Sequence, residues 1–213
     1  MFKSLIGLLL ISSGLITGQE LKPIALPSPQ TSGGMPLMQA LKERKSVRDF
    51  GPEQLSRQVL SNLLWAAWGI NRADGRRTAP SASNRQEIEV YVVMGDGAYL
   101  YDAKANALQP VVQSDLRKMA GTQAYVADAP LNLIYVADTA KLGGDDAGRM
   151  AMANANTGFI AQNVYLFCAS EGLGTVVRAS VNRVDLGKVL KLRPEQRITL
   201  AQTVGYAKKS AGD

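Results

Sequence analysis

The chain has 213 residues, a formal net charge of +6 and a hydrophobic content of 46%. These values are typical of a single globular domain with a good core and a basic surface. Histidine is absent and Cys168 is the only cysteine, which excludes histidine-dependent triads, histidine-ligated metals, thiolate metal clusters and an internal disulfide. No basic run is interleaved with aromatics, so we expect no nucleic-acid partner. Chemistry must come from a cofactor or from carboxylates, Lys, Arg or Tyr.

Residues 1–18 have the pattern of a secretory signal peptide. Lys3 gives a positive start, residues 5–16 are apolar apart from Gly and Ser, and Gly18 ends the segment with a small residue. A membrane anchor is the alternative, but the apolar run is shorter than the ~20 residues that a spanning helix needs. We therefore expect no stable membrane span, and we expect export to the bacterial periplasm or secretion.

Residues 19–35 contain three prolines and a Gly-Gly pair, which predicts a linker or extended arm before a domain at 36–213. The hydrophobic spacing and the breakers predict helices at 37–46, 52–69, 114–125, 145–170 and 183–190. Strands are expected at 88–94, 98–101, 107–112, 131–137, 175–177 and 198–206. Because direct β–turn–β links leave no room for crossover helices, the sheet should be mostly antiparallel. The expected fold class is α+β, with a central sheet flanked by helices.

The helix at 145–170 is apolar on most sides from Met150 onward. Such a helix is buried, either in the middle of the domain or between two subunits. The sequence therefore predicts a long central helix and a homodimer built around it. Cys168 lies in an apolar stretch of this helix and is expected to be a buried, inert thiol.

The segment 44–48 packs three cations and a hydroxyl into five residues, after a helix and just before Asp49-Phe50. Arg forks bind phosphate oxygens in pairs and Ser adds a hydroxyl donor, so the segment suits a terminal phosphate. The alternative is structural, because cations at a helix end are favoured by the helix dipole alone.

The segment 78–86 is a loop of small residues and amides. Pro80 restricts its backbone, and Asn84 and Gln86 offer both donors and acceptors. Most such loops are only connections. Together, however, the two segments could bind a ligand with an anionic end and a flat polar ring, which describes flavin mononucleotide (FMN).

Four segments in register resemble the flavin-dependent nitroreductase-like superfamily, and most of all its SagB/ThcOx-type dehydrogenase branch. They are RKSVRDF at 44–50, TAPSASNRQ at 78–86, EGLGTVVR at 171–178 and LAQTVGY at 200–206. The resemblance implies a nitroreductase-like α+β fold, tightly bound FMN and a homodimer with the flavin at the subunit boundary. Glu87-Ile88 follows Gln86 where many nitroreductases have Pro-Trp.

The resemblance also assigns cofactor-binding residues. Arg44, Lys45, Ser46 and Arg48 would hold the phosphate and ribityl tail, with Lys208 or Lys209 completing that site. The loop that touches the ribityl chain and the polar edge of the ring would contribute Ser81, Ala82, Asn84 and Gln86. Ala179 and Ser180 would bring backbone groups to the reactive nitrogen of the ring, where an N–H stabilises developing charge. No catalytic side chain and no metal ligand is assigned.

The resulting hypothesis is an FMN-dependent oxidoreductase that transfers hydride or electron pairs to or from a small-molecule substrate. The electron donor stays open among NAD(P)H, a quinol and a redox protein. One alternative is an exported flavin-binding or carrier module without turnover. The other is an exported α+β domain whose basic segments only solvate its surface.

Overall fold

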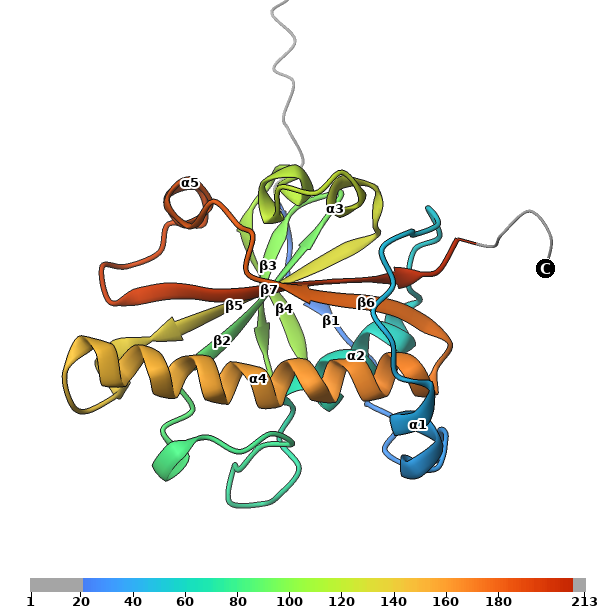
Figure 1. Ribbon diagram of the computed structural model, residues 1–213, viewed down its shortest axis with the longest axis horizontal. Coiled ribbons are helices and arrows are strands. Elements are labelled where there is room, and N and C mark those ends of the chain that lie inside the picture. The colour runs from blue at the N-terminus through green and yellow to red at the C-terminus, as the bar shows by residue number, and fades with distance from the viewer. Residues whose placement is uncertain (1–20, 209–213) are drawn as a thin grey trace, which may run out of the picture.

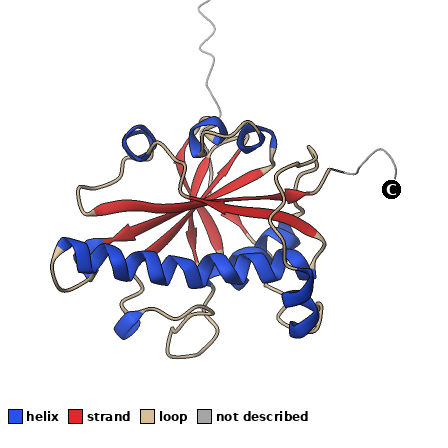
Figure 2. Cartoon of the chain, in the orientation of Figure 1, coloured by secondary structure: helices blue, strands red, loops and turns tan. Residues whose placement is uncertain are grey.

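The computed structural model describes residues 21–208, and its centre is one seven-stranded sheet (Figures 1 and 2). The strand order is β1-β4-β3-β2-β5-β7-β6, and every neighbouring pair is antiparallel. The strands are β1 Ile24–Ala25, β2 Ile88–Met94, β3 Ala98–Asp102, β4 Ala107–Val112, β5 Leu131–Asp138, β6 Leu173–Arg178 and β7 Gln196–Tyr206.

Helices cover both faces of the sheet. One face carries α1 (Leu37–Glu43), α2 (Arg57–Trp68) and the long α4 (Asp146–Ser170), and the other carries α3 (Tyr125–Asp128) and α5 (Arg183–Val189) (Figure 1). Short 3₁₀ turns lie at 82–84, 117–120 and 139–141. Alternate residues of a strand point to opposite faces, so β5 contributes Leu133 and Tyr135 to the α2/α4 core and Ile134 to the core under α5. All eight β5 residues are buried for this reason.

Most of the predicted elements are confirmed, including an α+β fold with an antiparallel sheet. The long helix begins one residue later than expected, because Asp145 is its N-cap and accepts a hydrogen bond from the Gly148 N–H at 2.8 Å. Cys168 is buried, as predicted, and burial raises the pKa of its thiol well above the usual value.

Three helix boundaries were predicted wrongly. Helix α1 ends at Glu43, so the cationic residues that follow are extended. Helix α2 begins at Arg57 after the N-cap Ser56, whose Oγ accepts from the Val59 N–H, and not at Pro52. The expected helix at 114–125 is a 3₁₀ turn at 117–120 followed by the one-turn α3, with Gly121 between them.

The arm that precedes the domain packs on it. Ile24–Ala25 pairs with Leu108 and Ala107 as the edge strand β1, and the Ser61 hydroxyl of α2 donates to the Pro27 carbonyl at 2.6 Å. The predicted leader, residues 1–18, lies outside the described residues. Within 21–208, no helix combines the length and apolar character needed to cross a membrane.

A cavity in the core should destabilise the fold far more than a truncation at the surface. Leu63 of α2 is fully buried, whereas Leu37 of α1 is 62% exposed. We expect Leu63→Ala to lower the free energy of unfolding by about 2–5 kcal/mol and Leu37→Ala to change it by less than about 0.5 kcal/mol. Urea denaturation of the two variants beside the wild type measures both values. Equal losses would contradict this assignment of the core.

Candidate functional site

The cationic segment Arg44–Arg48 runs along the end of the sheet where β6 starts and β7 finishes. The Val47 N–H donates to the Thr175 carbonyl at 2.9 Å, and the Gly51 N–H donates to the Tyr206 carbonyl at 2.9 Å. Gly174 permits this approach, because a Cβ there would lie only 2.9 Å from Val47 Cγ1. Phe50 anchors the segment in a small core beside Tyr125, with ring centroids 6.0 Å apart.

Cations converge at this end of the sheet. The Lys208 N–H donates to the Asp49 carbonyl at 3.1 Å, which brings the chain just after β7 beside the cationic segment. Lys45, Ser46, Arg48 and Lys208 are exposed and Arg44 is half-buried. Within residues 21–208 none of the four cations forms an ion pair. Their charge is therefore not neutralised by a carboxylate of the described residues.

Tyr165 of α4 holds this arrangement together. Its hydroxyl shares a hydrogen bond with Ser46 Oγ at 2.9 Å and accepts another from the Val177 N–H at 3.0 Å. The Arg44 guanidinium lies over the Tyr165 ring, 5.2 Å from its centroid, at a distance typical of a cation–π contact. The sequence did not single out Tyr165, because only tertiary contacts give it this role.

A cavity of about 340 Å³ opens beside the cationic segment, and Lys45, Val47, Tyr165 and Thr175 are among the residues that line it. From Thr175, β6 leads to Ala179, a distance of roughly 13 Å for four residues of strand. Ala179 and Ser180 are exposed at that end. One strand therefore connects the cationic end to the pair predicted to meet the flavin ring.

The loop 78–86 lies elsewhere, beyond α4 on the side away from the sheet (Figure 1). Thr78 attaches it to the end of α2 by donating from its N–H to the Gly69 carbonyl at 2.9 Å and from its hydroxyl to the Trp65 carbonyl at 3.1 Å. Arg77 donates to the Trp68 carbonyl at 2.8 Å and lies 4.8 Å from the centroid of that tryptophan ring. The loop is thus fixed at its start.

Gln86 organises the loop from within. Its Oε1 accepts from Arg77 Nε at 2.8 Å, its Nε2 donates to Asn84 Oδ1 at 3.0 Å, and its N–H donates to Ser81 Oγ at 3.0 Å. Ser83, Asn84 and Gln86 all have positive φ angles, between 48° and 52°. Backbone of this kind costs energy in non-glycine residues, so the surrounding hydrogen bonds must hold it. Three of the four predicted ligands in the loop therefore also shape it.

Helix α4 separates the two predicted halves of the site. Asn156 donates to Glu87 Oε1 at 2.6 Å next to the loop, whereas Tyr165 binds Ser46 beside the cationic segment. Nine residues of α-helix span roughly 13–14 Å. The structure thus brings Arg44, Lys45, Ser46, Arg48 and Lys208 together, and it places Ser81, Ala82, Asn84 and Gln86 in a separate group within the subunit.

Two ionisable side chains, Glu87 and Arg178, are buried near these groups. Glu87, which stands where many nitroreductases have proline, is fully buried, and its Oε2 has no hydrogen-bond partner among the described residues. Arg178, just before Ala179, is 7% exposed and donates at 2.6 Å to Ala120 O, Asn132 Oδ1 and Thr203 Oγ1. Burial lowers the pKa of Arg178. Because the Arg178 guanidinium donates only to neutral acceptors, no carboxylate of the described residues cancels its charge. The electrostatic potential at the end of β6 is therefore positive.

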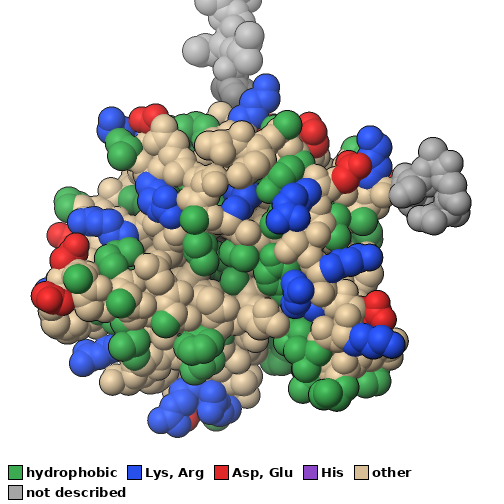
Figure 3. Space-filling view, viewed as in Figure 1, with side chains coloured by type: hydrophobic (Ala, Val, Ile, Leu, Met, Phe, Trp, Pro, Cys, Tyr) green, Lys and Arg blue, Asp and Glu red, His purple; other side chains and the backbone are tan. Residues whose placement is uncertain are grey.

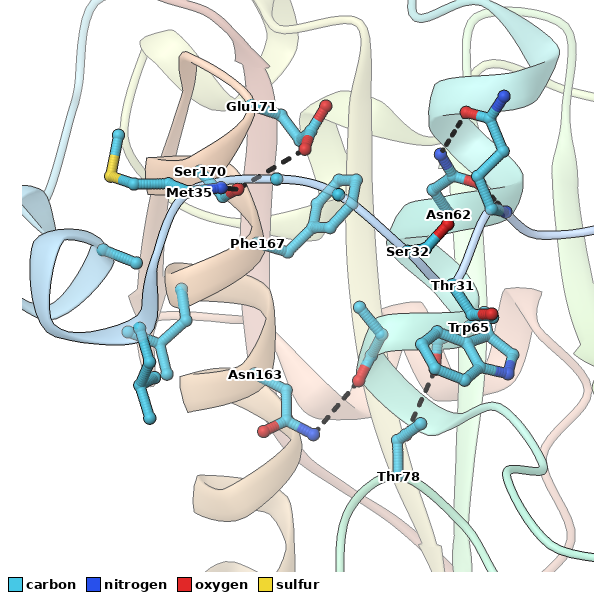
Figure 4. Close-up of a pocket in the computed structure, with 17 residues that line it drawn as sticks. Thr31, Ser32, Met35, Asn62, Trp65, Thr78, Asn163, Phe167, Ser170 and Glu171 are labelled. Carbon is cyan, nitrogen blue, oxygen red and sulfur yellow. Dashed lines mark hydrogen bonds between the residues drawn. The ribbon is translucent and has the colours of Figure 1, made fainter.

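A further cavity of about 470 Å³ lies between the arm, α2 and α4 (Figure 4). The backbone of residues 30–35 crosses it, with Trp65 and Asn163 on opposite walls. Asn163 donates to the Ala66 carbonyl at 3.0 Å and Ser170 Oγ accepts from the Met35 N–H at 2.7 Å. These hydrogen bonds hold the arm and both helices in place around the cavity.

Comparison with known protein families matches residues 41–206 to the nitroreductase family. The chain belongs to the nitroreductase family. Over 170 residues it is 31% identical to a protein of Methanocaldococcus jannaschii assigned as a nitroreductase, with 74% of this chain and 85% of that protein covered. The confirmed fold class is thus nitroreductase-like, and the family is one of oxidoreductases.

Solved structures agree with this assignment. A crystal structure of a Ralstonia eutropha protein assigned as a nitroreductase matches with a TM-score of 0.85 and 41% identity, covering 91% of this chain and 93% of that chain. The Escherichia coli microcin synthetase McbBCD complex matches with a TM-score of 0.68 and 22% identity over 98% of this chain and 76% of that chain. At that identity it shares the fold alone.

Removing the Tyr165 hydroxyl should destabilise the protein, because the Val177 N–H would lose its partner. We expect Tyr165→Phe to lower the free energy of unfolding by about 1–3 kcal/mol. The matched control is Tyr206→Phe, since no hydroxyl hydrogen bond of Tyr206 is found within residues 21–208. Denaturant titration of both variants checks the prediction, and equal stability of the two would contradict the role of Tyr165.

Proposed function

We propose that this nitroreductase-family protein is an FMN-dependent oxidoreductase. The observation that carries the proposal is the convergence of Arg44, Arg48 and Lys208, which form no ion pair within residues 21–208, and of Ser46 at one end of the sheet. Their chain neighbours Lys45, Val47 and Ala207 line the adjacent cavity. Guanidinium forks, an ammonium and a hydroxyl are the donors that a terminal phosphate requires. The residues present therefore fit the phosphate end of FMN, and bound FMN would supply the hydride or electron-pair chemistry that this chain lacks.

The protein's own residues would bind and orient the flavin. The cationic segment and Lys208 would hold the phosphate, Lys45 and Tyr165 line the adjacent cavity, and Ala179-Ser180 would meet the ring about one strand length away. The buried Arg178 guanidinium next to that pair would favour negative charge on the ring. No catalytic side chain is assigned.

We further propose a homodimer in which the loop 78–86 of one subunit completes the site of the other. Within one subunit α4 separates the loop from the cationic segment, and the loop extends beyond α4 (Figure 1). Met152 and Phe159 of α4 are 42% and 48% exposed, and Met38 of α1 is 77% exposed. A two-fold related copy would cover these apolar side chains and bring both halves of the site together.

We also propose that the protein is similar in activity to the SagB/ThcOx-type dehydrogenases. Resemblance to the SagB/ThcOx-type dehydrogenases is supported by the four sequence segments and by the fold shared with the microcin synthetase complex. NAD(P)H, a quinol and a redox protein are the candidate electron donors, and export would favour the last two. The alternative function is a flavin-binding or carrier module without turnover, and turnover assays with several donors on the flavin-loaded protein separate the two functions.

The FMN proposal is tested by equilibrium dialysis with FMN and riboflavin. We expect one FMN per subunit at micromolar concentration. Arg48→Ala should weaken FMN roughly ten- to hundredfold, the equivalent of ~1.5–3 kcal/mol, and should affect riboflavin little because only FMN has the phosphate.

Arg57→Ala is the matched control, because it removes the same charge from the first residue of α2. It should leave both affinities unchanged. Retention of no FMN by the wild type would refute the cofactor, and equal losses for the two ligands would mean that Arg48 has only a structural role.

The dimer is tested by Phe159→Asp, which places a charge on the exposed face of α4. We expect light scattering to show a dimer for the wild type and a monomer that binds flavin weakly for the variant. Ile160 is unsuitable for this test, because it is fully buried inside its own subunit. Gln162→Asp, also exposed on α4, is the control. A wild-type monomer with flavin fully bound would refute the proposal.

A further inference from the structure

The loop that follows α2 is strongly basic. Residues 71–86 contain four arginines and one aspartate, a net charge of +3. In the space-filling view, Lys and Arg side chains gather at the lower edge of the molecule, over this loop (Figure 3). The FMN site described above uses none of these four arginines. Phosphate binding by FMN therefore does not account for the positive charge of this loop.

Three of the arginines line one hollow of about 420 Å³, which we call the arginine hollow. Arg72, Arg76 and Arg77 line it together with Ser81, Ser83 and Asn84. Arg85, the fourth arginine of the loop, does not. The hollow therefore concentrates guanidinium groups beside hydroxyl and amide groups, which is a donor set for a multiply charged anion.

The guanidinium groups are positioned mostly by neutral partners. Arg77 donates to the Trp68 carbonyl and to Gln86 Oε1, and Arg72 donates to Asn71 Oδ1 at 3.1 Å and to the Arg77 carbonyl at 3.2 Å. Among the described residues, Arg76 is the only one of the three that forms an ion pair, with Asp74 at 2.9 Å, and both side chains of that pair are at least half exposed. A surface pair of this kind is weak, so a net positive charge remains in the hollow.

The hollow also has a defined place relative to the proposed cofactor. Ser81 and Asn84, which line it, belong to the loop expected to touch the ribityl chain and the ring edge. The single phosphate of FMN is assigned to the cationic segment, on the other side of α4. An anion in the arginine hollow would therefore belong to a different molecule, one that lies near the ring.

We propose that the arginine hollow binds the phosphoryl or pyrophosphoryl group of the small molecule that reacts with the flavin. The link to the flavin depends on the function proposed above, whereas the anion site itself does not. The hollow has room for a small group, and the guanidinium forks match phosphate oxygens in pairs. The substrate or electron donor would then be a phosphorylated compound anchored by its charged end.

Isothermal titration calorimetry with pyrophosphate tests the proposal on FMN-loaded protein at fixed ionic strength. We expect one pyrophosphate per subunit, with an affinity that falls as salt is added. The double variant Arg72→Gln/Arg76→Gln should weaken binding by about tenfold or more. Arg85→Gln, with a charge removed from the same loop but outside the hollow, should change the affinity by less than about threefold.

Absence of pyrophosphate binding by the wild type would overturn the proposal. The proposal would also be overturned if Arg85→Gln weakened pyrophosphate binding as much as each substitution of the double variant does on average. The anion would then be attracted by the charge of the whole loop and not held in the arginine hollow. If the wild type retains no FMN, the FMN-dependent function is refuted, whereas the anion site is still tested by the pyrophosphate titrations. The same titrations in an Arg48→Ala background, where the cationic segment is weakened, would still decide whether the hollow binds the anion.

Discussion

The packing of α4 against the sheet is the constraint on which the rest of the structure depends. The helix is continuous over 25 residues and crosses β5, β7 and β6 (Figure 1). Its inner face places Ile160 and Val164 in the core. Polar side chains on the same helix then fix the surroundings, Asn156 at Glu87 and Tyr165 at Ser46. Because a helix is a stiff rod with a constant rise, these two attachments set the spacing between the basic loop and the cationic segment.

Periodicity predicted the strands and the long helix well, because burial on one face or both imposes a regular pattern on the sequence. It failed at 51–56 and 114–125. Pro52 resembles a helix start, yet Ser56 has the side chain that caps α2, and Gly121, in an extended conformation, interrupts the second segment. Local signals of this kind compete, and tertiary contacts decide between them.

The site was predicted less completely than the fold. The resemblance located the cationic segment and the loop, and the structure brings Lys208 to the former. The structural roles of Tyr165, Arg77 and Glu87 could not be predicted, because they depend on tertiary contacts. Tyr165 contacts Ser46, and Glu87 contacts Asn156, and both partners are far away in the sequence. Gln86 was identified as a ligand from its chemistry, but its bonds to Arg77, Asn84 and Gly75 are what shape the loop.

The place of β7 in the sheet has a consequence for the order in which the molecule assembles. This strand, at 196–206, lies between β5 and β6, and both pair with it over most of their length. A ribosome makes it after every other strand, so β5 and β6 have an unpaired edge until then. The sheet therefore cannot close before β7 has been made, and Lys208 cannot join the cationic segment before then.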